Sequence, residues 1–124
     1  MKIRATIAAL ALAGTLSLAG AQGAAASAAA VSEFLVYSPS GTVTLTCGPE
    51  GGTHPAAKEA CAEIDKAAGD IAAVPPLPGQ GCTGVWDPVL IGVTGKWQGK
   101  EVLFSSFESN EGCAKIRHGH IFRY

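Results

Sequence analysis

The fold is decided by residues 42–61, TVTLTCGPEGGTHPAAKEAC, in which a strand pattern, a turn and a helix pattern follow one another. From Thr42 to Cys47, threonine alternates with apolar residues, which predicts a strand with one buried face. Glycines and a proline at 48–52 break the strand, and Pro55 suits the first turn of a helix. The residues expected on the buried helix face are Ala57, Cys61, Ile64 and Ala68. Cys61 should therefore point inward, where Cys47 could meet it.

The elements outside this stretch are mostly strands. Residues 34–37 form a short β-prone run, and residues 72–80 hold three prolines and one glycine, which predicts an irregular surface loop. Two apolar runs at 89–93 and 97–104 flank residues 94–96 and predict a β-hairpin. Residues 105–119 are polar with room for a short helix, and residues 121–124 are expected as an edge strand. Together these elements predict an α+β domain with an antiparallel sheet.

The N-terminus has the pattern of a secretory signal. A basic start at 1–4 precedes an almost wholly apolar run at 5–18, and small-x-small alanine patterns follow it. The apolar run falls short of the roughly 20 residues that a membrane-spanning helix needs. We therefore expect a signal peptide at 1–30, cleaved between 21 and 30, and one secreted domain at 31–124.

Charge and cysteine content restrict the function further. Of nine basic and ten acidic residues, Lys2 and Arg4 fall in the signal, so the remaining domain has a formal charge of −3. Such a domain has no electrostatic reason to bind nucleic acid or an anionic membrane. An even number of cysteines in a small exported domain predicts two disulfides. Four cysteines allow three pairings, among which the sequence does not choose; we favour the nearest-neighbour pattern.

Enzyme and metal chemistry find little support in the sequence. It has no nucleophile elbow, zinc-protease helix motif or phosphate-binding loop, so we expect no catalytic residues and no cofactor. His118 and His120 would share a strand face, but no third metal ligand stands at a telling spacing, and we expect two solvent-exposed histidines. The carboxylates of the helix region are expected on a solvated face with neighbouring lysines. These carboxylates are Glu59, Glu63, Asp65 and Asp70.

The segment Cys82–Pro88 differs in kind from an ordinary loop. It joins the proline-rich stretch to the hairpin, begins with a cysteine, ends with a proline and places Val85 and Trp86 where they can be exposed. A clamped, exposed segment of this kind can dock as an extra strand on another protein. If that protein is a protease, the segment is a substrate that does not easily leave. A plain connection held by a disulfide would have the same composition, so the residues alone leave both interpretations open.

Three blocks of the sequence carry a resemblance to a known family: Thr44–Cys47 with Gly52–Ala57 and Ala60–Ala62; Val85–Leu90; and Gly95–Lys100 followed by Ser109–Glu111. In their order and cysteine spacing they resemble the Streptomyces subtilisin inhibitor family. The resemblance implies a two-layer α+β sandwich with a five-stranded antiparallel sheet and two helices, usually a homodimer through the sheet. It implies the disulfide pairs Cys47–Cys61 and Cys82–Cys113.

The resemblance also implies a secreted inhibitor of subtilisin-like serine proteases that acts by the standard mechanism, with its reactive bond between Gly84 and Val85. The residues that would support the loop are Cys82, Thr83, Trp86, Asp87, Pro88, Asn110 and Cys113. The residue before the bond is often methionine or lysine in the family, whereas this chain has Gly84, so we expect weak inhibition of subtilisin itself. Gly81, Thr83 and an apparent insertion at Gly112 are further departures.

Two other functions stay open at this point. One is an inhibitor or slow substrate of a metalloprotease that recognises the residue after the bond, for which Gly84-Val85 is a sensible cleavage site. The other is a secreted transglutaminase substrate, cross-linked through Gln80, Gln98, Lys96 and Lys100.

Overall fold

The structure is a computed structural model that describes residue 14 and residues 30–124. The expected signal peptide at 1–30 lies almost entirely outside the described residues. Within the described part of the chain, neither helix combines the length and the apolar character of a membrane-spanning segment.

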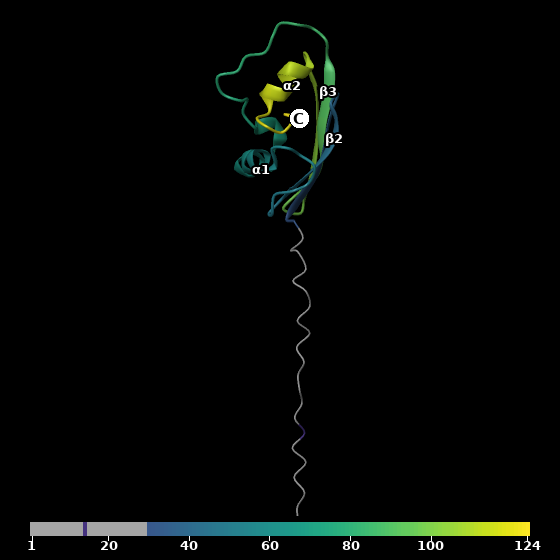
Figure 1. The fold of residues 1–124 in the computed structure, drawn as a ribbon, viewed down its shortest axis with the longest axis vertical. Coiled ribbons are helices and arrows are strands. Elements are labelled where there is room, and N and C mark those ends of the chain that lie inside the picture. Colours follow the sequence, from purple (N-terminus) through teal and green to yellow (C-terminus); the bar gives the residue numbers. More distant parts are fainter. Residues whose placement is uncertain (1–13, 15–29) are drawn as a thin grey trace, which may run out of the picture.

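An antiparallel sheet and two helices form two layers (Figure 1). The elements in chain order are β1 (Ser32–Ser38), β2 (Gly41–Cys47), α1 (Ala57–Lys66), a 3-10 turn η1 (Ile71–Ala73), β3 (Val89–Trp97), β4 (Lys100–Glu108) and α2 (Glu111–Arg117). The strand order in the sheet is β2-β1-β3-β4, with every neighbouring pair antiparallel. Both helices lie on one face of the sheet, which confirms the predicted α+β class and its two helices.

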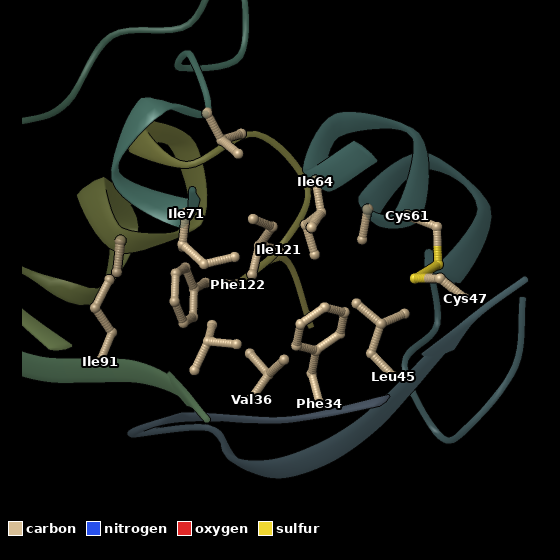
Figure 2. Packing of buried hydrophobic residues seen from close by; sticks show 14 residues of the cluster. Phe34, Val36, Leu45, Cys47, Cys61, Ile64, Ile71, Ile91, Ile121 and Phe122 are labelled. Carbon is tan, nitrogen blue, oxygen red and sulfur yellow. A yellow bond between two sulfur atoms is a disulfide. The ribbon is translucent and has the colours of Figure 1, made fainter. Parts of the chain in front are cut away.

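The core lies between the sheet and the helices, as Figure 2 shows. Alternation in β1 and β2 sends Phe34, Val36 and Leu45 inward, where they meet Ile64 of α1. The disulfide between Cys47 and Cys61 joins β2 to α1, with a Cα–Cα distance of 5.6 Å. The strand-turn-helix prediction and this pairing are confirmed. The predicted helix face ends early, because the helix stops at Lys66 and Ala68 is exposed.

Two predictions about the hairpin and the chain end are wrong. The turn between β3 and β4 is at Gln98 and Gly99, not at 94–96, because these two residues both have positive φ, 47° and 81°, as a tight hairpin turn requires. Gly95 instead lies within β3, where its φ is 150° and a Cβ would clash with the Glu33 carbonyl.

The described part of the chain has four strands where five were predicted. Residues 121–124, expected as an edge strand, are not in the sheet. Ile121 and Phe122 are fully buried in the core, and the Ile121 carbonyl is bound by the His54 ring at 2.8 Å. Because the His54 side chain binds the Ile121 carbonyl, that carbonyl does not form a hydrogen bond with a neighbouring strand.

The connection from η1 to β3 is a long loop that protrudes from the body of the protein. It leaves the helix layer, arches outward and enters the sheet at the first residue of β3 (Figure 1, green). The end of β4 and the start of α2 lie beside its return, since Val89 pairs with Glu108. The fold therefore brings the β4–α2 junction against residues 82–88.

Candidate functional site

The exposed loop at 78–88 is fixed to the body near both ends. At its start, Leu77 is buried, and its amide donates to the Ile116 carbonyl at 2.9 Å. At its end, the Asp87 amide donates to the Ser109 carbonyl at 2.8 Å. Every residue from 78 to 88 is exposed. The loop is therefore both presented to solvent and held.

Asn110 ties the loop to α2. Its Oδ1 accepts from the Cys113 amide at 2.8 Å, which makes it the N-cap of α2, and its side chain is largely buried. Its Nδ2 donates to the Val85 carbonyl at 2.8 Å. The same Nδ2 lies 3.4 Å from the Thr83 carbonyl and 3.5 Å from the Thr83 hydroxyl. One side chain therefore contacts the residues on both sides of Gly84.

The centre of the loop points away from the protein. Val85 is 59% exposed and Trp86 is 78% exposed. A Cβ built on Gly84 would meet no atom within 4 Å, so this position has room for any side chain. Pro88, at the exit, is also exposed. The apolar groups that could fill pockets of a partner are thus Val85 and Trp86, whereas Gly84 offers none.

Cys82 and Cys113 are neighbouring thiols in the structure, the first exposed and the second buried. A hydrogen bond between them raises the pKa of Cys82, with burial adding to the effect. The same hydrogen bond lowers the pKa of Cys113, and hydrogen bonds with Ser109 and Asn110 lower it further. Of the two predicted disulfides, therefore, one is present and the second pair is held side by side as thiols.

A buried carboxylate next to this site was missed in the sequence. Glu108, the last residue of β4, is 5% exposed and accepts from the His118 ring Nε2 at 2.9 Å. Its other oxygen lies 3.4 Å from Nε of Arg117. A signal for it existed, since Glu108 has the same strand parity as the inward-facing Val102 and Phe104. The expected strand ended at 104, and so this parity was not extended to 108.

The prediction of two solvent-exposed histidines is wrong. His118 follows α2 in a turn, and its ring lies edge-on to Phe104 and Phe122 at centroid distances of 5.1 and 5.7 Å. His120 contacts the Glu63 carboxylate with its ring, and its amide donates to the same carboxylate at 2.7 Å. Neither histidine lies on a strand.

The predicted solvated face of the helix region is confirmed for Glu59, Asp65 and Asp70, which are exposed, whereas Glu63 is only partly exposed. Three of these carboxylates nevertheless make directed contacts. Glu63 binds the turn at His120. Asp65 accepts from the Trp97 indole at 2.8 Å. Asp70 caps η1 by accepting from the Ala72 amide at 3.1 Å.

Comparison with known proteins shows which class of protein this chain resembles. The family model for subtilisin inhibitor-like proteins matches residues 12–110. Plasminostreptin of Streptomyces antifibrinolyticus is 45% identical over 82 residues, which are 65% of this chain and 74% of that protein. A subtilisin inhibitor of Streptomyces albogriseolus is 46% identical over 82 residues, which are 65% of this chain and 56% of that protein.

A solved structure agrees with these sequence relatives. It is that of Streptomyces caespitosus sermetstatin in complex with Bacillus licheniformis subtilisin, with a TM-score of 0.52 and 29% identity. The match covers 69% of this chain and 90% of that chain. The chain belongs to the subtilisin inhibitor-like family, as its sequence predicted. Other relatives, from Streptomyces avermitilis and Streptomyces fradiae, are named as subtilase-type protease inhibitors, the first of them as a probable one.

Proposed function

We propose that this protein is a secreted inhibitor of subtilisin-like serine endopeptidases that presents residues 82–88 as a substrate-like loop, with its reactive bond between Gly84 and Val85. The observation that carries the proposal is the Asn110 side chain, which spans that bond from behind. It binds the Val85 carbonyl at 2.8 Å on one side and lies 3.4 Å from the Thr83 carbonyl on the other. A loop fixed before binding loses little conformational entropy on binding, which favours high affinity for a modest contact area.

The same contacts explain how cleavage would stall. The protease serine attacks the Gly84 carbonyl, forms an ester with it and releases the Val85 amine. Val85 stays in place because its carbonyl is bound by Asn110, and the Asp87 amide two residues later is bound by Ser109. The amine therefore remains next to the ester and can attack it again, which restores the peptide bond. Water must displace this amine before hydrolysis can be completed.

The acyl side of the bond would be retained by a disulfide between Cys82 and Cys113. The two thiols lie close enough for each to shift the pKa of the other, which supports this pairing. Oxidation would remove two electrons and two protons from the pair, taken up by a disulfide-bonded oxidant outside the cell. Cys82 would then be joined covalently to α2, two residues before the reactive bond.

Gly84 sets the expected potency. A side chain missing from the specificity pocket forgoes roughly 1.5–3 kcal/mol of apolar burial. The extra freedom of glycine in the unbound loop costs roughly 0.5–1 kcal/mol more. At about 1.4 kcal/mol for each factor of ten, the protein should inhibit subtilisin roughly 30- to 700-fold more weakly than a relative with a large side chain at this position.

We further propose a homodimer through the outward face of the sheet. That face exposes Leu35, Leu90, Leu103 and Phe107, and Leu103 is 83% exposed. Leu90 pairs with Phe107 in the sheet, and Thr94 lies between Leu35 and Leu103. Exposed apolar residues gathered on one face mark an interaction surface. Sedimentation velocity should show a dimer that the Leu103→Glu variant converts to a monomer.

The decisive experiment incubates the protein, produced without residues 1–30, with catalytic amounts of subtilisin. Residual protease activity and the masses of fragments are followed together. Sustained inhibition with reversible cleavage between Gly84 and Val85 supports both mechanism and register. Rapid digestion without inhibition contradicts the proposal. Parallel incubations with a zinc protease and with a transglutaminase test the two other functions, and N-terminal sequencing of the exported protein tests the signal cleavage.

A further inference from the structure

Three consecutive residues at the end of β4 each hold a different part of the site. The Glu108 side chain binds the end of α2 through Arg117 and His118. The Ser109 carbonyl accepts from the Asp87 amide of the loop. The Asn110 side chain caps the start of α2 and binds the Val85 carbonyl. Because these residues adjoin one another, a contact that fixes Glu108 also restricts the two residues that hold the loop.

The Glu108 contact is an unusual one for a small domain. Its carboxylate is buried, yet it has two directed partners: Nε2 of His118 at 2.9 Å and Nε of Arg117 at 3.4 Å. The Ser106 hydroxyl is a third neighbour at 3.4 Å. Removing a carboxylate from water is costly, and a buried ion pair often contributes little net stability. Its directed bonds nevertheless allow few arrangements of the groups that make them.

Helix α2 needs such a restraint because its apolar packing is small. It has seven residues, of which only Cys113 and Ala114 are buried. Asn110 holds its first turn and Glu108 holds the residues at its end. With the far end released, the helix could tilt about its start, which would move the Asn110 amide relative to Val85.

We propose that Glu108 is a positioning residue for the reactive loop: through Arg117 and His118 it fixes α2, and thereby the Asn110 side chain that holds Val85. The proposal rests on the proposed inhibitory function for its kinetic consequence. Its structural consequence, a more mobile contact between the loop and the β4–α2 junction, is independent of that function. Glu108 acts from behind the loop and does not touch the protease.

The test compares two variants with a matched control. Glu108→Leu removes the carboxylate and places an apolar side chain in the buried site; it leaves Nε2 of His118 without its partner, which costs stability. Glu108→Gln keeps the shape and removes the charge, and it serves if the leucine variant does not fold. The control is Glu111→Gln, which removes a carboxylate from the same helix. The Glu111 side chain contacts Ser40 and Lys115 rather than the loop.

Inhibition of subtilisin, hydrolysis of the Gly84–Val85 bond, the thermal midpoint and hydrogen exchange at the Asp87 amide are measured for each. We expect Glu108→Leu to weaken inhibition about tenfold, equivalent to about 1.4 kcal/mol, and to speed hydrolysis of the loop. Glu108→Gln should have a smaller effect of the same kind. Exchange at the Asp87 amide should rise in both variants and stay unchanged in Glu111→Gln. These changes should appear far below the thermal midpoint, where a loss of stability alone would have no effect.

Two results would overturn the proposal. Native inhibition and native Asp87 exchange in a folded Glu108 variant would show that the pair does not position the loop. Equal effects in Glu111→Gln would show a general sensitivity of α2. If the unaltered protein fails to inhibit subtilisin, the proposed function fails, and unchanged Asp87 exchange in the Glu108 variants would still refute the positioning role by itself.

Discussion

Replacement of Asn110 by aspartate should separate the two tasks of this side chain. Its Oδ1 caps α2 through the Cys113 amide, and its Nδ2 binds the Val85 carbonyl. Aspartate is as good an N-cap as asparagine, so Asn110→Asp keeps the first task. It loses the second, because a carboxylate oxygen cannot donate to a carbonyl and repels it instead.

The expected magnitudes follow from these contacts. A hydrogen bond contributes about 0.5–1.5 kcal/mol, and with the added repulsion we expect Asn110→Asp to weaken inhibition of subtilisin about tenfold, or about 1.4 kcal/mol. Asn110→Ala loses the cap as well, which costs about 1 kcal/mol of stability. For a domain of this size, that loss lowers the thermal midpoint by about 4–8 °C.

The assay pairs inhibition constants with thermal melts and mass spectrometry of the loop. Asn110→Asp should melt near the native temperature, inhibit weakly and be hydrolysed faster between Gly84 and Val85. Asn110→Ala should show the same kinetic defect together with the lower melting temperature. If Asn110→Asp inhibits as the native protein does, the hydrogen bond to Val85 does not hold the reactive bond, and the reasoning is refuted.

Four further predictions follow. Gly84→Met should tighten binding to subtilisin and Gly84→Lys binding to trypsin, because a side chain there meets no neighbour in the free protein; unchanged constants in both would show that the reactive bond lies elsewhere. Trp86→Ala should weaken inhibition about 30-fold, as expected for an aromatic anchor worth about 2 kcal/mol, with no change in the thermal midpoint. A Cys82→Ser, Cys113→Ser double variant should lose sustained inhibition and be cut rapidly; full activity would exclude a role for this pair. Burial raises the pKa of Tyr124 above its usual value of about 10, so its contribution to stability is complete below that pH and is lost as the pH rises through the raised pKa; urea unfolding at alkaline pH should show less of this loss in Tyr124→Phe.

The sequence predicted correctly the parts of the fold that depend on residues close together in the chain. The alternation at 42–47 and the helical spacing of Cys61 and Ile64 placed the disulfide to Cys47, because strand and helix are joined by a short turn. The hairpin turn was misplaced for a physical reason. Gly95 suggested a turn in the sequence, but it lies within β3, where the lack of a side chain lets β1 approach closely. The turn itself is at Gln98 and Gly99.

The contacts that hold the loop are long-range and could not be read from spacing. Leu77 binds the Ile116 carbonyl across 39 positions of chain, and Asn110 binds the Val85 carbonyl across 25. The exposure of residues 82–88 follows from their proline, their glycine and the proline-rich stretch before them, whereas their anchoring depends on where α2 lies. Glu108 is an intermediate case: the strand alternation indicated that it points inward, but its partners Arg117 and His118 lie at the far end of α2 and directly after it.

The anchoring of the loop is unequal on the two sides of the proposed reactive bond, and this inequality assigns separate roles to its supports. On the amine side, the Val85 carbonyl and the Asp87 amide each have a hydrogen bond of 2.8 Å. On the acyl side, Thr83 has longer contacts: 3.4 and 3.5 Å to Asn110, and 3.9 Å from the Cys113 thiol to its carbonyl. Hydrogen bonds of 2.8 Å would hold the amine in place, whereas the acyl side would depend on the proposed disulfide between Cys82 and Cys113, which are thiols in the structure. The oxidation state of this pair should therefore govern whether cleavage ends in resealing or in release of the loop.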